Sequence, residues 1–278
     1  AINKDQLANI EVNQLGFEFS EQRRIAYVLS TVQTAIEQQE RLIKITRELK
    51  SALMHKLFTE GLRGEKQKMT EIGPVPESWD VVKISQAYTF TEKRREANLS
   101  QPIPFIPMEL IPVGENEIVN YETREKVTSG TYVENGDLLI AKITPSFENG
   151  KQGILKIPFE KAFATTEVIP IKPIQGKSDL LYLHYYLFMP NVRSTMAGKM
   201  EGTTGRQRLS KTIVGEQLIP LPKILEQKEI SQMLSRFDDK ILVTKRKKTI
   251  LEELFRTLLH QLMTGQTRVN DIDLPGFK

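Results

Sequence analysis

The chain has 278 residues, and its 39 lysines and arginines exceed its 35 aspartates and glutamates by only four, so the formal net charge is +4. This small surplus permits a nucleic-acid partner without requiring one. The absence of cysteine excludes disulfides, thiolate zinc sites and a cysteine nucleophile, and it fits a cytoplasmic location. Three scattered histidines indicate no metal cage, and no apolar run approaches the roughly 18 residues of a membrane span.

Residues 1–20 precede the first predicted helix. The stretch 7–12 resembles residues 214–219, which close the globular domain found later in the chain. We therefore expect residues 1–20 to be the remnant of an upstream domain or a lead-in to the helix. The chain begins with Ala1, which is typical of a fragment or a processed protein.

Residues 21–64 are predicted to form a long helix. Apolar residues recur three or four positions apart, and no proline or glycine intervenes before Gly61, which suits a helix end. Forty residues of helix span about 60 Å at a rise of 1.5 Å per residue. The apolar stripe comprises Ile25, Leu29, Val32, Ile36, Leu42, Ile45, Leu49, Leu53 and Leu57.

Residues 65–222 differ in character, because proline and glycine cluster here, as expected of a mixed α+β domain with long loops. The apolar run 138–143 follows an Asn-Gly turn and is predicted to be a buried strand. Weaker strand candidates are 81–84, 154–157 and 167–171. Residues 179–189 are predicted to form a helix that stops near Pro190.

Two loops of this domain carry the candidate contacts. The first, 142–151, leaves the buried strand, and the second, 198–211, is basic and rich in glycine and threonine. Glycines let backbone N–H groups approach an anion, and Arg, Gln and Asn side chains can bind base edges. A solvated, flexible loop is the competing interpretation. The candidate residues are Lys142, Thr144, Asn149, Lys151, Thr203, Thr204, Arg206, Gln207 and Arg208.

A third basic cluster is interpreted as a phosphate-contacting patch or simply a loop, and it consists of Lys93, Arg94 and Arg95. Among all candidates, Asn149 and Gln207 suit base reading, because their amides can donate to and accept from one adenine edge. The lysines suit phosphate contacts, being point charges.

Residues 223–278 are predicted to form a second long helix and a tail, and this helix repeats the first. Aligning 21–63 with 226–268 leaves no gap, and 15 of the 43 positions are identical, against roughly 3 for random pairing. Gly265 suits the end of this helix, whose apolar stripe comprises Ile230, Leu234, Phe237, Ile241, Ile250, Leu254, Leu258 and Leu262. A narrow apolar stripe needs a partner, so we expect the two helices to pair. Because the domain leaves the end of one helix and returns to the start of the other, the pair should be antiparallel; alternatively, each helix packs only on a globular domain.

These features together resemble the DNA-specificity subunit of type I restriction–modification systems, over nearly the whole chain. The segment 72–79, reading IGPVPESW, is similar to the start of a target-recognition domain, and 136–142, reading GDLLIAK, to its central strand. Segments 202–207 and 219–222, followed by Glu226-Gln227, resemble its closing part and the start of a long helix. The predicted fold is therefore α+β: one recognition domain plus two coiled-coil-like antiparallel helices.

The resemblance has one departure, since the family's full subunit carries two recognition domains and this chain holds one complete domain. Residues 13–19, reading NQLGFEF, stand where a Pro-Leu-Pro entry to the first helix would be expected. The chain thus resembles a half subunit, and a second copy in a homodimer could supply the other domain.

The resemblance implies a protein that is not an enzyme. It would bind double-stranded DNA and direct methyltransferase and restriction subunits, which use S-adenosylmethionine, ATP and Mg²⁺, to a target, with the helix pair setting half-site spacing. The sequence has no phosphate-binding loop and no Asn-Pro-Pro-aromatic methyltransferase motif. The alternative is a coiled-coil scaffold whose middle domain binds protein.

Overall fold

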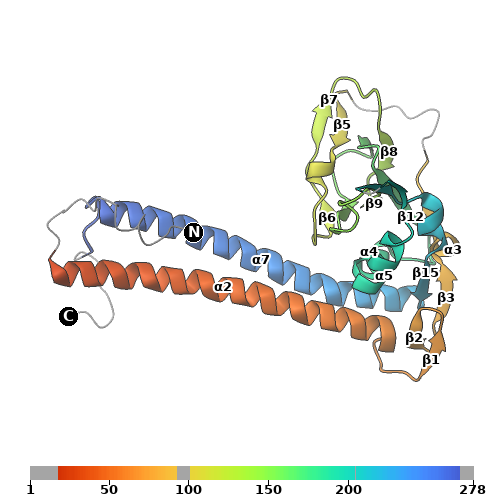
Figure 1. The fold of residues 1–278 in the computed structure, drawn as a ribbon, viewed down its shortest axis with the longest axis horizontal. Coiled ribbons are helices and arrows are strands. Elements are labelled where there is room, and N and C mark those ends of the chain that lie inside the picture. The colour runs from red at the N-terminus through yellow and green to blue at the C-terminus, as the bar shows by residue number, and fades with distance from the viewer. Residues whose placement is uncertain (1–17, 93–100, 204, 270–278) are drawn as a thin grey trace. The chain divides into compact units, whose positions relative to one another are not determined.

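The computed structural model describes residues 18–92, 101–203 and 205–269, and Figure 1 draws their helices and strands as a ribbon. The chain divides into two units, one made of 1–47 with 240–278 and one of 48–239. Two long helices, α2 (Phe19–Glu60) and α7 (Ile224–Met263), contribute residues to both units. The mixed α+β class predicted from sequence is confirmed.

Both long helices end where the glycines predicted. Gly61 follows α2 with φ +66°, and Gly265 lies two residues beyond the end of α7 with φ +72°. Both values fall in the left-handed region that glycine adopts without steric cost. At Gly61 a Cβ would also lie only 3.1 Å from the Pro76 ring.

In the first unit, α2 and α7 run antiparallel, as predicted. Lys248 binds Glu40 at 2.8 Å, and Arg268 binds Glu21 at 2.7 Å, so contacts move toward the start of α2 as they move along α7. A small apolar cluster of Ile25, Leu262 and Val269 lies at the same end as the Glu21 contact.

The predicted apolar stripe is wider than the seam that the helices use. Ile45 is 41% exposed, and Ile250 and Leu254 are 63% and 44% exposed, so their prediction as packed positions is wrong. The seam instead includes Ile43, which the stripe omitted, and a polar residue, Thr244. A two-helix contact covers only a narrow face of each helix, which leaves the other apolar positions open.

The second unit is built on two sheets. One has the strand order β4 (Tyr88–Phe90), β12 (Val168–Pro173), β9 (Leu138–Ala141), β10 (Gln152–Leu155), β6 (Glu117–Ile118). The other has the order β7 (Glu122–Arg124), β5 (Ile103–Ile106), β11 (Lys161–Ala164), β8 (Thr131–Glu134). Three two-stranded pairs complete the strands: β1 (Gln67–Thr70) with β2 (Gly73–Pro76), β3 (Asp80–Lys83) with β15 (Leu218–Leu221), and β13 (Glu201–Thr203) with β14 (Arg206–Arg208).

Short helices connect these strands. They are α3 (Ile84–Ala87), the 3₁₀ turn η1 (Met108–Leu110), α4 (Leu180–Phe188), α5 (Pro190–Ala197) and α6 (Lys211–Glu216). The strand predicted at 138–143 is confirmed as the fully buried β9, and β3, β10 and β12 overlap the weaker candidates. Helix α4 is capped by Asp179, whose side chain accepts from Tyr182 N at 2.8 Å. Pro190 ends α4 as predicted and also begins α5, because proline suits the first helical position.

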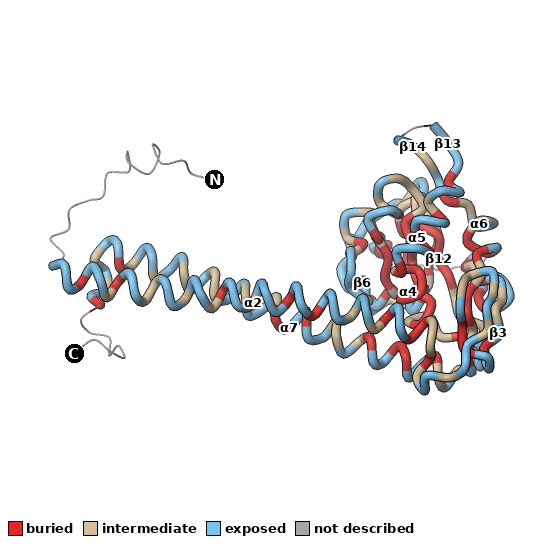
Figure 2. Tube along the Cα trace, turned by 60° about the horizontal axis from the view of Figure 1, so that its bottom comes forward, coloured by how far each residue is buried: buried red, intermediate tan, exposed pale blue. Residues whose placement is uncertain are grey.

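The main core joins the globular domain to the helix ends within this unit. Phe58 of α2 packs its ring 5.0 Å from Tyr182 and 5.5 Å from Tyr186 of α4, and Ile230 and Leu234 of α7 are fully buried in the same cluster. Figure 2 shows this burial along α4 and α5. The helices therefore pack on each other and on the domain, so the alternative in which each helix packs only on a domain is wrong.

The domain boundaries expected at residues 65 and 222 stay predictions, since they follow composition, whereas the core takes in helix residues on both sides of the domain. None of the helices in the described parts of the chain is long and apolar enough to cross a membrane.

Candidate nucleic-acid interface

The structure brings the two predicted contact loops together, although more than forty residues separate them in sequence. Ile143 and Arg208 form an isolated antiparallel bridge. Beside it, Thr144 N donates to Gln207 O at 3.1 Å, and Gln207 N donates to Thr144 Oγ1, also at 3.1 Å. The start of the first loop thus continues strand β9 as a partner of β14.

The second loop is a β-hairpin rather than the irregular loop that its composition suggested. Strands β13 and β14 pair antiparallel, with Glu201 opposite Arg208 and Thr203 opposite Arg206. Gly202 has φ +135°, and a Cβ there would lie 2.5 Å from Arg206 O, so only glycine fits. The hairpin stands clear of the rest of its unit (Figure 2), and its side chains are mostly exposed.

A buried arginine, which the sequence analysis did not identify as a site residue, holds the first loop in place. Arg193 of α5 donates to Phe147 O and to Gln152 Oε1, and its guanidinium lies 4.8 Å from the Phe147 ring centroid. Gln152 in turn donates to His184 O at 2.8 Å. Burial lowers the pKa of Arg193 to about 10, and burial, with Lys50 and Arg193 nearby, lowers the pKa of His184 to about 3. The loop is therefore positioned by a buried polar chain around a charged guanidinium and a neutral imidazole.

A cavity of about 370 Å³ lies where the hairpin meets the first loop. Its lining residues come from both predicted loops and from the residue that precedes β12, and they are Ile143, Thr144, Glu167, Gly205, Arg206 and Arg208. A second cavity of about 470 Å³ lies between the first loop and α5, and Asn149 and Arg193 are among the residues that line it.

Glu167 is the carboxylate of the first cavity, and its sequence position predicted only the start of a strand. Its Oε1 binds Arg208 Nη2 at 3.0 Å. Its Oε2 is buried and has no hydrogen-bond partner among the described residues. Because β12 pairs antiparallel with β9, with Val168 opposite Ala141, Glu167 falls beside the strand end from which the first loop leaves. The role of Glu167 could therefore have been predicted only if the pairing of β12 with β9 had been known.

The candidate residues differ in how available they are. Lys142 and Thr144 are half-buried, Asn149, Thr203, Arg206 and Arg208 are exposed, and Gln207 is half-buried. Lys151 is half-buried as well, and its Nζ donates to Met108 O at 2.7 Å, so it already has an internal partner. Thr204, Lys93, Arg94 and Arg95 lie outside the described residues.

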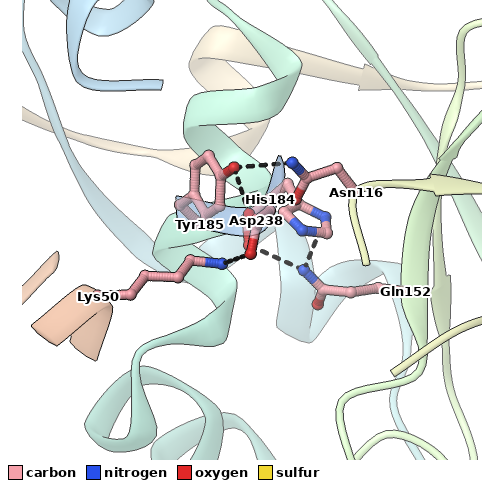
Figure 3. A network of polar contacts seen from close by, with 6 residues as sticks. All are labelled: Lys50, Asn116, Gln152, His184, Tyr185 and Asp238. Atoms are coloured by element: carbon pink, nitrogen blue, oxygen red, sulfur yellow. Dashed lines mark hydrogen bonds and ion pairs between the residues drawn. The ribbon is translucent and has the colours of Figure 1, made fainter. Parts of the chain in front are cut away.

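A second polar network fixes the domain to the helix ends (Figure 3). Asp238 of α7 binds Lys50 of α2 at 2.5 Å and accepts from the Tyr185 hydroxyl at 2.7 Å, and that hydroxyl accepts from Asn116 at 2.8 Å. Burial lowers the pKa of Lys50 and raises that of Tyr185, where Asp238 raises it further. The network links α2, α7, α4 and the segment before β6, so it orients the domain rather than binding a ligand.

Among the described residues there is no group of three or more His, Asp or Glu side chains that could hold a metal ion. The geometry is that of a basic hairpin and a braced loop side by side, with side chains of the kinds that bind phosphates and base edges.

Comparisons with a family model and with curated proteins identify the same family. A family model described as "Type I restriction modification DNA specificity domain" matches residues 76–253. The chain is 25% identical to the type I restriction enzyme MjaVIII specificity subunit of Methanocaldococcus jannaschii, over 98% of this chain and 65% of that protein. It is 28% identical to the EcoAI specificity subunit of Escherichia coli, over 73% of this chain and 35% of that one.

Two solved structures share the fold. The HsdS subunit from Thermoanaerobacter tengcongensis has a TM-score of 0.55 at 17% identity, covering 89% of this chain and 59% of that one. The type I restriction–modification S subunit from M. genitalium has a TM-score of 0.53 at 18% identity, covering 88% and 61%. The chain spans less than two thirds of the length of the curated relatives that it matches over nearly all of its own length.

Proposed function

Because the chain belongs to the family of type I restriction–modification DNA specificity domains, we propose that it binds double-stranded DNA at a chosen sequence and directs methyltransferase and restriction subunits to it. The observation that carries this proposal is the joining of the basic hairpin to the first loop, through paired backbone at Thr144 and Gln207. A two-stranded ribbon of this kind fits the major groove of B-DNA.

The residues divide into two roles. Exposed cations without a carboxylate partner, of which Arg206 is the clearest, contact phosphates and hold register. Asn149, exposed at the tip of the first loop, can pair with adenine through its amide. Thr203 adds a hydroxyl donor on the hairpin. Lys151 is a weaker phosphate contact than its sequence suggested, because Met108 O already binds it.

The two long helices serve as spacer and docking surface in this proposal. They contain 42 and 40 residues, in keeping with a spacer that fixes the distance between half-sites. In the first unit the exposed apolar residues of both helices offer a surface for the methyltransferase subunits, and they are Leu42, Ile45, Leu242, Val243, Ile250, Leu254 and Leu259. A large exposed apolar patch is typical of a protein interface.

The chain itself performs no catalysis in this proposal. The methyltransferase subunits use S-adenosylmethionine, the restriction subunits use ATP and Mg²⁺, and the complex acts on DNA in the cytoplasm. In the same proposal, two copies of the chain in a homodimer would read a two-part target.

The test is retention of DNA by the purified chain over a range of salt concentrations. Neutralised phosphates release counterions, so the logarithm of the affinity should fall steeply and linearly with the logarithm of the salt concentration. A scaffold whose middle domain binds protein would retain no DNA at low salt, and that result would reject the proposal in favour of the scaffold.

A further inference from the structure

The two arginines of the hairpin that line the 370 Å³ cavity stand in different electrostatic surroundings. Arg206 and Arg208 are two residues apart on β14, so they share one face of the strand, while Gln207 faces the other way. No carboxylate among the described residues pairs with Arg206. Arg208 is bound by Glu167 at 3.0 Å, although its side chain remains 66% exposed. Within the described part of the chain, one guanidinium therefore has a carboxylate partner that orients it, and the other has none.

The Glu167 carboxylate is itself held in place. Its side chain is only 21% exposed, its Oε1 accepts from Thr166 Oγ1 at 3.2 Å as well as from Arg208, and its backbone carbonyl accepts from Lys142 N at 2.9 Å. On the other side, the Arg208 backbone is bridged to Ile143. Both ends of the ion pair are thus anchored to the same paired backbone, which limits the orientations that the guanidinium can take.

A fixed guanidinium suits one base above the others. Guanine presents two acceptors, N7 and O6, side by side in the major groove, and they match the parallel N–H donors of arginine. A carboxylate that binds one edge of the guanidinium sets the plane in which the remaining donors lie, and it reduces the freedom lost on binding. A contact with a phosphate does not require the guanidinium plane to be oriented in this way.

We propose that Arg208 reads a guanine in the major groove, and that Glu167 is the positioning residue that orients its guanidinium for this contact. Arg206, on the same face but unpaired, binds a phosphate. This inference rests on the proposed function and deepens it, because it assigns one base of the target to one residue.

The experiment is selection of bound duplexes from a randomised pool by the full chain, followed by affinity measurements on the selected sequence and its single-base variants. We expect one guanine position at which Arg208→Lys lowers discrimination about tenfold, because lysine keeps the charge but cannot bind both acceptors. Glu167→Gln should weaken discrimination at the same position, by about threefold. Arg206→Gln should instead weaken binding to all sequences alike and lower the salt slope by about one.

Glu117→Gln serves as the matched control, since it removes another surface ion pair of this domain, Glu117–Lys156 at 2.8 Å, and should leave the base preference unchanged. Thermal unfolding of each variant checks that the fold is kept. If Arg208→Lys and Glu167→Gln keep the wild-type preference at every position, the inference is overturned while the proposed function stands. If the wild-type chain itself selects no sequence, the proposed function fails.

Discussion

At the scale of single residues, Arg193 shows how a buried charge can shape an exposed loop. It supplies hydrogen bonds to Phe147 O and Gln152 Oε1 and packs beside two aromatic rings, Phe147 and Phe188. Both hydrogen bonds are buried. The position of the first loop therefore depends on a residue more than forty positions away in the sequence.

Arg193→Met should lower the free energy of unfolding by about 2–4 kcal/mol, because two buried acceptors lose their donor. Urea unfolding measures this change. Arg206→Met, at an exposed arginine of the hairpin, is the control and should stay within about 0.5 kcal/mol of wild type. Equal effects of the two substitutions would contradict the bracing role of Arg193.

Asp137 is a second buried charge, and it makes stability depend on pH. Burial raises the pKa of this carboxyl to about 6, only partly offset by the backbone hydrogen bond from Glu134 and the charge of Lys172. Between pH 4 and pH 6 the folded chain therefore binds more protons than the unfolded chain, and its stability falls as the pH rises through that window. Burial lowers the pKa of His184 to about 3, and this shift makes the stability rise with pH over the same window. The two effects oppose each other, so the pH dependence of wild-type stability shows neither of them separately.

Asp137→Asn separates them. Asparagine stays neutral and can still accept from Glu134 N, which binds Asp137 Oδ2 at 2.8 Å. The free energy of unfolding of the variant, relative to wild type, should rise by up to about 3 kcal/mol between pH 4 and pH 7, since His184 cancels in the difference. Urea titrations at several pH values measure it, and a difference that does not change with pH would exclude the raised pKa.

How far residue roles were predictable depends on whether their partners were near in sequence. The composition of the basic hairpin and of the first loop was enough to predict them as candidate contact segments, and the structure places them together. Glu167 and Arg193 could not be found, because each acts through residues about forty positions away that only strand pairing or helix packing brings close. The hydrogen bond from Lys151 Nζ to Met108 O could not be found either, since the two residues are distant in the chain.

At the scale of elements, the junction between the helix ends and the domain is held by the Lys50–Asp238 pair. The side chains are only 15% and 11% exposed, and Tyr185 extends the network to α4. The repeat that relates α2 to α7 could not show this pair, because position 238 aligns with Gln33 rather than with an acidic residue. Periodicity located both helices and their glycine ends, but it misassigned the exposed Ile45 and Ile250 to the packed face.

Lys50→Met should cost about 3 kcal/mol of unfolding free energy, because it leaves Asp238 buried without its cation. The double variant Lys50→Met/Asp238→Asn should lose less than the sum of the two single variants, with a coupling energy above about 1 kcal/mol. A double-mutant cycle in urea measures it. Strict additivity would mean that the pair does not hold the junction.

At the scale of the whole molecule, the residues proposed to read DNA and those proposed to bind partner subunits belong to different units of the chain. The hairpin and first loop belong to the second unit, and the exposed apolar positions Ile45 and Ile250 belong to the first. The repeat places these two isoleucines at equivalent positions of the two helices. Changes at one site should therefore leave the other function intact.

Ile45→Glu/Ile250→Glu should abolish assembly with the methyltransferase subunits and leave DNA binding within about twofold of wild type, because a charge on an apolar interface must be desolvated. Co-purification and DNA retention measure the two effects. Gln38→Glu, which adds charge at an exposed polar position of α2, should change neither. Loss of DNA binding in the double variant would show that the two parts are not separable.

The most direct test of the central claim is a map of methylated positions in a genome where this chain is expressed with its methyltransferase subunits. The account predicts methylation at one recurring short sequence, palindromic if two copies act together and one-sided if a single copy acts. Methylation scattered over unrelated sequences, or unchanged when the chain is left out, would contradict it.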